Sequence, residues 1–210
     1  MPQKEWTFDK IKEKFQHRRP DAVGSYGHFS VLIPLVEENG ELCLLYEVRS
    51  PDLETQPGEV CFPGGMIEEG ETPLQAAVRE TTEELGLSED DIEVFAKTDS
   101  LYAPAAFTMH CYIGRVDTTN MDIGQDEVAR TFTVPISWLM KNPPEMYYTK
   151  LLQFPPDDFP YEKVHAKGGY KWRRGEIPVP VYDNEGPDPI WGLTARITEN
   201  FIEILKGEKK

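Results

Sequence analysis

The sequence predicts an α+β fold in which helices pack on a mixed β-sheet, and three observations support this. The segments expected to be regular follow one another as strand, helix and strands, without the regular alternation of a parallel sheet. An Asn-Gly pair at Asn39-Gly40 joins two apolar runs in the manner of a hairpin turn. Hydrophobic residues make up 39% of the 210 residues, which is enough for the core of one domain. We therefore expect residues 1–210 to form a single domain.

The expected elements can be placed in order along the chain. Apolar residues at 8, 11 and 15 share one helical face and predict an N-terminal helix over about 7–17. The helix Pro73–Leu85 begins at a proline and stops at Gly86, the usual residues at these two ends. A C-terminal helix is expected over about 194–206. Strands are predicted at 28–36, 41–48, 59–62, 92–98, 109–116 and 130–134.

A proline-rich insertion occupies about 142–190. Nine of the eighteen prolines fall in those residues, so long helices are excluded there. Within it, residues 163–167 and 170–174 flank Gly168-Gly169 and are predicted to pair as a hairpin.

Charge and composition exclude several classes of protein. The 22 basic and 37 acidic residues give a formal charge of −15, which argues against binding to a nucleic-acid backbone. No apolar run approaches the ~20 residues needed to span a bilayer, and the first residues lack the apolar core of a signal peptide. The three isolated cysteines suit buried, reduced thiols. These features predict a cytoplasmic protein with no membrane or nucleic-acid partner.

Acidic residues concentrate around the central helix. Nine of them lie between residues 65 and 91 against a single basic residue, Arg79. Glu80, Glu83 and Glu84 stand at i, i+3 and i+4, so their side chains share one helical face. Such carboxylates repel unless a cation neutralises them, and carboxylate oxygens without His or Cys favour Mg²⁺ or Mn²⁺. The alternative is an ordinary solvated acidic face.

The spacing around this helix resembles the Nudix box, G-x5-E-x7-R-E-(apolar)-x-E-E-x-G-(apolar), over residues 65–87. All seven fixed residues are present: Gly65, Glu71, Arg79, Glu80, Glu83, Glu84 and Gly86. Thr81 stands where an apolar residue is usual, and we expect it to pack through its methyl group. The resemblance implies the Nudix fold, a mixed sheet between helices in an α/β/α sandwich.

The resemblance also implies roles for these residues. Glu83 and Glu84 would be the principal metal ligands, with Glu80 a ligand or the group that polarises water, and the Gly65 carbonyl would be a further ligand. Arg79 and Glu83, four residues apart, can form an ion pair that holds the glutamate in place. Which glutamate acts as general base stays open. A further carboxylate commonly comes from outside the box, and Glu127 is the best placed; the alternative is a solvated charge at a strand edge.

A narrower signature upstream of the box resembles the coenzyme A diphosphatase branch, L-L-T-x-R-(S/A)-x3-R-x3-G-x3-F-P-G-G. Eight positions match, of which we expect Arg49, Phe62 and Gly64 to contact substrate. Tyr46, Glu47 and Glu54 depart from the pattern, and Glu54 replaces a cation with an anion that would repel phosphate. The segment 190–196 also resembles this branch, although it reads equally as the start of a core helix.

Residues 163–174 hold five Lys or Arg residues and no acid, so Lys171 and Arg173 are candidates for binding a polyanionic substrate. A solvated basic segment is the alternative. The resemblance implies a metal-dependent hydrolase that cleaves the diphosphate of coenzyme A or an acyl derivative. ADP-ribose, a dinucleotide or a nucleoside triphosphate are alternative substrates, and a non-catalytic nucleotide-binding regulator is an alternative of another class. A homodimer is a possible assembly.

Overall fold

A tight hairpin lies at the centre of the sheet in the computed structural model, which describes residues 6–18, 23–24, 26–104, 106–124, 126–166, 168–183, 186 and 188–208. The two strands are β1 (Gly27–Glu38) and β2 (Glu41–Arg49), and Glu38 pairs directly with Glu41. Asn39 and Gly40 have φ values of 52° and 79°. Positive φ at both turn residues gives the turn whose twist matches that of the strands. The predicted hairpin is confirmed.

Six further strands extend this hairpin into a mixed sheet. β3 (Val60–Cys61) and β8 (Val128–Pro135) pair with β2, and β4 (Gly64–Met66) pairs with β1. β7 (Phe107–Val116) runs parallel to β1, while β5 (Ile92–Lys97) and β6 (Leu101–Ala103) pair antiparallel to β7. The parallel pair among antiparallel neighbours confirms the mixed sheet expected from the order of elements.

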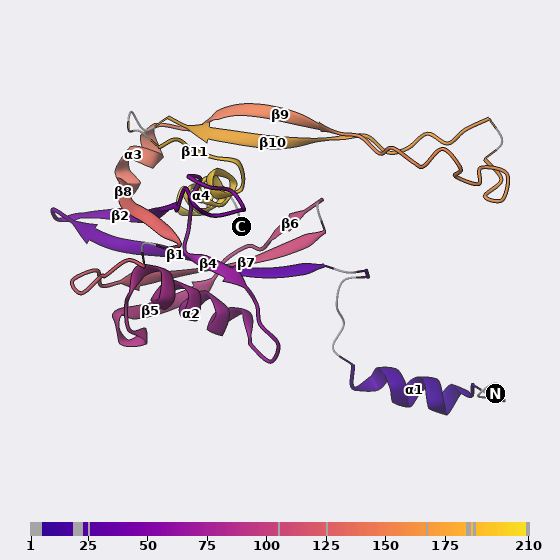
Figure 1. The fold of residues 1–210 in the computed structure, drawn as a ribbon, viewed down its shortest axis with the longest axis horizontal. Coiled ribbons are helices and arrows are strands. Elements are labelled where there is room, and N and C mark those ends of the chain that lie inside the picture. Colours follow the sequence, from indigo (N-terminus) through magenta and orange to yellow (C-terminus); the bar gives the residue numbers. More distant parts are fainter. Residues whose placement is uncertain are drawn as a thin grey trace.

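Two helices cover opposite faces of this sheet (Figure 1). Tyr46 of β2 belongs to one apolar cluster with Phe201 of α4 (Gly192–Leu205), and Leu45 belongs to a second cluster with Leu85 of α2 (Pro73–Leu85). Successive side chains of a strand point to opposite faces, so adjacent residues of β2 reach different helices. The layers are those of an α/β/α sandwich. A 3₁₀ turn, η1 (Glu89–Asp91), and a short helix, α3 (Ile136–Lys141), complete the described part of this body.

The proline-rich segment forms a second, three-stranded sheet of β9 (Glu145–Leu151), β10 (Gly175–Tyr182) and β11 (Ile190–Trp191). We call residues 145–182 the arm, and Figure 1 shows it projecting past the main sheet. The hairpin predicted at 163–174 is wrong, because the paired strands lie outside it and the described residues between them form turns.

Two prolines sit inside the paired part of the arm. Pro178 and Pro180 of β10 lie opposite Tyr148 and Met146 of β9. Because these prolines are two residues apart, their nitrogens, which carry no hydrogen, face the same edge of β10. The other edge keeps its amide donors and can pair with β9. The sequence interpretation treated proline only as a helix breaker and so missed these strands.

The N-terminal helix is confirmed as α1 (Phe8–Gln16), with Thr7 as its N-cap. None of its residues is buried, and Figure 1 shows it apart from the sheet. Its apolar stripe, including Phe8 and Phe15, therefore contributes nothing to the core described here. In the part of the chain that the structure describes, no helix has the length and apolar character required to cross a membrane.

Candidate active site

Helix α2 is fixed at both ends by its own sequence. The Thr72 hydroxyl accepts from the Gln75 backbone N–H at 3.3 Å, while the Gln75 side chain accepts from the Thr72 backbone N–H at 3.0 Å. Such reciprocal capping satisfies donors that the first turn leaves open. At the other end Gly86 takes a left-handed conformation, with φ 61° and ψ 40°. These two ends set the rotation of the helix and therefore the direction of its glutamates.

Thr81, the departure from the usual box, is fully buried against the sheet side of α2. Its hydroxyl donates to the Ala77 carbonyl at 2.7 Å. Because that bond satisfies the hydroxyl within the helix, only the methyl group has to pack in the core. Thr81 therefore lies in the core, as expected from its methyl group.

Arg79 holds three glutamates of the box at once. Its guanidinium lies 2.8 Å from Glu71, 2.9 Å from Glu80 and 3.1 Å from Glu83, and it also donates to the Met66 carbonyl at 3.2 Å. The Glu83 contact is the predicted i, i+4 pair. Glu71 ties the loop before the helix to the same cation. The bond to Arg79 lowers the pKa of Glu71 and correspondingly raises the pKa of Arg79, so this pair stays charged.

Gly64 and Gly65, the pair of glycines at which the box begins, let the backbone come close to the helix. The Gly64 N–H donates to Oε2 of Glu84 at 2.8 Å. At Gly64, with φ 151°, a side chain would collide with the backbone of β1, and at Gly65 it would collide with the Glu80 carboxylate. Only glycine therefore allows both glutamates to lie against this turn.

The structure brings four carboxylates together, and we call Glu47, Glu80, Glu84 and Glu127 the acidic cluster. Glu84 is 4% exposed, and burial is the main cause that raises its pKa, followed by repulsion from Glu47 and opposed by the Gly64 hydrogen bond. Burial also raises the pKa of Glu80, against the effect of Arg79. The charge of exposed Glu127 adds to both shifts, so the predicted outside carboxylate does lie near the box. Its neighbour Gln125 lies outside the described residues.

Glu47 is the residue that the sequence analysis missed. It is 1% exposed in β2; its Oε1 accepts from the Cys61 thiol at 3.1 Å, and its Oε2 has no hydrogen-bond partner. Burial is the main cause that raises its pKa, and the Cys61 bond and Arg49 oppose the shift. A glutamate inside an apolar strand was a usable signal, because unpaired acidic residues are almost never fully buried.

The donor chemistry of this cluster fits a hard divalent cation. Its members offer only oxygen, two of them are nearly fully buried, and a cation would relieve the repulsion that adds to the effect of burial in raising their pKa values. Within the described residues, no three acidic, histidine or cysteine side chains are already arranged to hold a metal ion. Glu80 and Glu83 each direct one carboxylate oxygen to Arg79, and the second oxygen of each is not part of that pairing.

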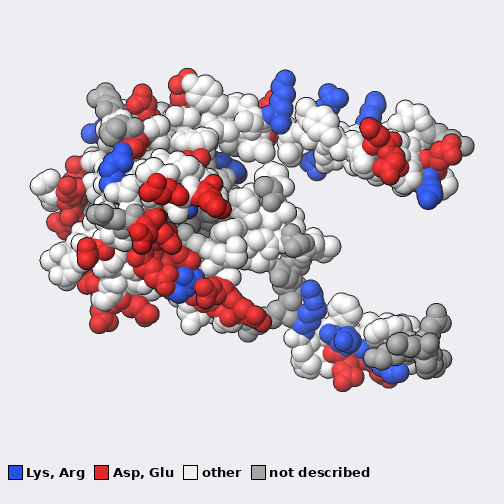
Figure 2. All heavy atoms as spheres, viewed as in Figure 1, with Lys and Arg blue, Asp and Glu red and all other residues white. Residues whose placement is uncertain are grey.

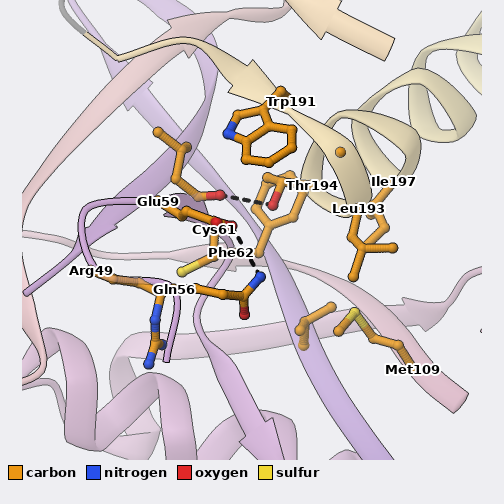
Figure 3. A pocket seen from close by; sticks show the side chains of 13 residues that line it. Arg49, Gln56, Glu59, Cys61, Phe62, Met109, Trp191, Leu193, Thr194 and Ile197 are labelled. Carbon is orange, nitrogen blue, oxygen red and sulfur yellow. Dashed lines mark hydrogen bonds between the residues drawn. The ribbon is translucent and has the colours of Figure 1, made fainter. Parts of the chain in front are cut away.

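A pocket of about 200 Å³ lies between β3 and the start of α4 (Figure 3). Its apolar lining includes Phe62, Trp191 and Leu193, and Arg49 stands at one side. Phe62 is 3% exposed and stacks on Tyr46 at 4.8 Å, so it is a core residue as well as a lining residue. Cys61 also lines the pocket while its thiol binds Glu47. The pocket and the acidic cluster therefore share a wall.

The start of α4 forms another side of this pocket. The Thr194 hydroxyl donates to the Val60 carbonyl at 2.9 Å, which fastens the helix to β3, and Trp191 remains 45% exposed above the opening. Segment 190–196 thus serves as the beginning of a core helix and as pocket wall. The interpretation of that segment as the start of a core helix is confirmed, and its part in substrate binding stays a prediction.

Lys171 and Arg173 lie in a segment away from the acidic cluster (Figure 1). They belong to the end of the arm, whose aromatic residues pack on one another: Trp172 contacts Phe159 and Tyr170, each at 5.2 Å between ring centroids. Figure 2 shows acidic side chains gathered around α2, whereas several Lys and Arg side chains lie along the arm. The structure does not bring this basic segment to the acidic cluster. Lys167 lies outside the described residues.

The comparisons with known proteins agree with this geometry. The family model described as the NUDIX domain matches residues 27–155. Nudix hydrolase 3 of Caenorhabditis elegans is 38% identical over 184 residues, covering 84% of this chain and 72% of that protein. Peroxisomal coenzyme A diphosphatase NUDT7 of Mus musculus is 34% identical over 160 residues, covering 70% of this chain and 64% of that protein. The chain thus spans just under two thirds of the length of the mouse protein.

A solved structure supports the fold alone. A MutT/nudix family protein from Enterococcus faecalis aligns with a TM-score of 0.53 at 13% identity, covering 96% of this chain and 70% of that one. Its alignment extends beyond residues 27–155, so the likeness includes elements outside the matched family model.

Proposed function

This chain belongs to the Nudix family of hydrolases, whose members generally require divalent metal ions, and we propose that it hydrolyses coenzyme A or acyl-coenzyme A. The products would be phosphopantetheine, acylated or free, and adenosine 3′,5′-bisphosphate. The observation that carries this proposal is the wall shared by the acidic cluster and the pocket. A diphosphate held at the cluster would leave its organic part beside the pocket. The mouse relative is named as a coenzyme A diphosphatase, which supports this substrate.

For the cation we propose Mg²⁺ or Mn²⁺, held by Glu80, Glu83, Glu84 and Glu127 with the Gly65 carbonyl. Oxygen donors of this kind suit both ions. When bound, the cation supplies charge neutralisation of the diphosphate and a lowered pKa of the attacking water. Buried Glu84 contributes a fixed position, because the Gly64 N–H holds one of its oxygens.

The other residues of the site bind the substrate or orient the metal ligands. Arg79 sets the positions of Glu80 and Glu83 through its two ion pairs. Arg49, which donates to the Thr55 carbonyl at 3.3 Å, is held at the pocket where it can pair with a phosphate. Phe62 lines the pocket, and the Gly64 N–H binds Glu84 of the box. Water attacks phosphorus, and the bond from that phosphorus to the bridging oxygen breaks.

Four expectations from the sequence stay predictions. They are substrate contact by Lys171 and Arg173, a homodimer, a single domain over 1–210 and a cytoplasmic location. The name of the mouse relative gives a peroxisomal location for that protein. A localisation experiment with the tagged chain would decide the last of them.

A panel of diphosphates tests the substrate directly. Coenzyme A, acetyl-coenzyme A, dephospho-coenzyme A, ADP-ribose and a dinucleoside polyphosphate are each incubated with Mg²⁺ or Mn²⁺, and products are separated by chromatography. We expect the highest kcat/KM for coenzyme A or its acetyl derivative, with adenosine 3′,5′-bisphosphate as a product. A clear preference for ADP-ribose or the dinucleotide would contradict the proposed coenzyme A substrate, while the broader proposal of a diphosphatase would stand. Binding of all five without any hydrolysis would favour a non-catalytic regulator.

A further inference from the structure

The nearly complete burial of Glu47 is unusual for a glutamate with a purely structural role. Burying an ionised carboxylate without full pairing is costly, and proteins avoid it unless something binds the charge. Glu47 is 1% exposed, one oxygen accepts a single weak thiol donor, and the other oxygen has no partner. The resemblance to the coenzyme A branch places threonine at this position, so the carboxylate is a feature of this chain.

The strand directs Glu47 to the same face as the box. Cys43 and Leu45 of β2 belong to the apolar cluster on the α2 side, and side chains two residues apart share a face. Glu47 continues that row. Leu44, Tyr46 and Val48 belong to the cluster on the opposite side. The carboxyl of Glu47 therefore lies under α2, on the side from which Glu84 approaches the sheet.

The neighbours of Glu47 identify what would bind it. Cys61, which donates to Glu47, lies three residues before Gly64, whose N–H holds Glu84, and Gly65 lies against the Glu80 carboxylate. The Ser50 N–H donates to the Glu127 carbonyl at 2.7 Å, so Glu127 lies beside the end of β2, and the four residues surround one place in the fold. The nearby cation, Arg49, forms its described hydrogen bond with Thr55 and none with Glu47. A hydrophobic partner or an added neutral hydrogen-bond donor would offset none of the charge of these four acidic groups, whereas one divalent cation would offset two of their charges.

We propose that Glu47 is an additional ligand of the divalent-cation site, with Cys61 holding Oε1 and leaving the unpartnered Oε2 for the ion. The inference rests on the proposed function, since it concerns the same metal site. It adds a ligand from the sheet to the ligands from the box. Cys61 acts as a positioning residue, because its thiol holds the carboxylate and its other side lines the pocket.

The test measures metal binding without substrate. Glu47→Gln keeps the size of the side chain and removes its charge, and Glu47→Thr installs the residue of the resembling branch. Glu93→Gln, the same change at an exposed position of β5, is the matched control. Mn²⁺ affinity is measured by electron paramagnetic resonance of the free ion, and melting temperatures are measured with EDTA and with millimolar Mg²⁺.

We expect both Glu47 variants to lose at least ~10-fold in Mn²⁺ affinity, the lower end of what removal of a supporting group at a metal site costs. Their melting temperatures in EDTA should stay equal to or above wild type, because a repelling charge is gone, while the gain from Mg²⁺ should shrink. The Glu93 variant should match wild type in all three measurements.

Wild-type Mn²⁺ affinity in both Glu47 variants would overturn the inference. So would a loss of stability that is the same with and without metal, or failure to fold in EDTA, because either result assigns Glu47 a purely structural role. The substrate proposal fails separately: if wild type hydrolyses none of the panel but Glu47→Gln still weakens Mn²⁺ binding, the ligand assignment stands alone.

Discussion

The two faces of the central sheet differ in what they carry. The face under α2 holds buried carboxylates whose geometry is set by one helix, two glycines and Arg79. The face under α4 holds an apolar pocket assembled from β3, β1 and the start of α4, which are far apart in the sequence. The comparison suggests that the catalytic groups are positioned mainly by residues close together in the sequence, whereas the pocket that would recognise the substrate is formed by packing between distant segments. Substitutions on the two faces should therefore change different kinetic constants.

The largest effect is expected on the α2 face. Glu84→Gln and Glu83→Gln each keep the shape of the side chain and remove a ligand charge, so we expect kcat to fall at least ~10²-fold, equivalent to about 3 kcal/mol of transition-state stabilisation. Steady-state kinetics under saturating Mg²⁺ is the measurement, with circular dichroism to check the fold. Glu89→Gln, just beyond the box, is the control. Wild-type turnover in both variants would remove these glutamates from the site.

A smaller effect of another kind is expected on the α4 face. Trp191→Ala removes a large apolar surface at the pocket mouth, so KM for coenzyme A should rise ~10-fold, or about 1.4 kcal/mol, with kcat within a factor of two. The matched control is Tyr148→Ala, an exposed aromatic residue on the arm. If Trp191→Ala lowered kcat and left KM unchanged, the division between the two faces would be refuted.

The α2 face should also make stability depend on pH when metal is absent. Burial raises the pKa values of Glu47 and Glu84 above their ordinary 4.5. Between 4.5 and the raised values the folded protein binds more protons than the unfolded chain, so the free energy of unfolding falls as pH rises. We expect a loss of about 1–3 kcal/mol between pH 5 and pH 8, since one pKa unit is worth about 1.4 kcal/mol.

Urea denaturation in EDTA at the two pH values measures this loss. Glu84→Gln should show a smaller decrease than wild type, and saturating Mg²⁺ should remove most of it by favouring the charged carboxylates. A stability that is constant or rises across this range would mean that the cluster is better neutralised than its burial indicates.

The smallest effect concerns Glu54, in the exposed loop next to Thr55, whose carbonyl accepts from Arg49. Glu54→Arg should lower KM for coenzyme A several-fold, because a guanidinium can pair with its 3′-phosphate. KM for dephospho-coenzyme A, which lacks that phosphate, should change much less. Equal improvement for both substrates, fading with salt, would show only a general field effect, since exposed charges are screened over ~8 Å.

The sequence predicted best what depends on neighbouring residues. Helix α2 between its proline and Gly86, the Asn39-Gly40 turn and the Arg79–Glu83 pair all follow from spacing within a few residues, and the structure confirms them. Strands β9 and β10 were missed because a strand is stabilised by its distant partner, and proline disguises it. Glu47 stands out in its apolar segment, but its contact with Cys61 and its place beside Glu84 arise from packing between distant segments, which the sequence alone does not give.

The paired prolines of β10 have a consequence for behaviour at high concentration. A long hairpin with a free edge is a template on which a second molecule can add a strand. At Pro178 and Pro180 the edge of β10 that faces away from β9 offers no amide hydrogen, so an incoming strand would find two consecutive donor positions missing beside the short pairing with β11. The composition that hides the arm from secondary-structure reasoning thus also blunts one edge of the hairpin against edge-to-edge aggregation, whereas β9, which contains no proline, keeps its amide donors along its outer edge.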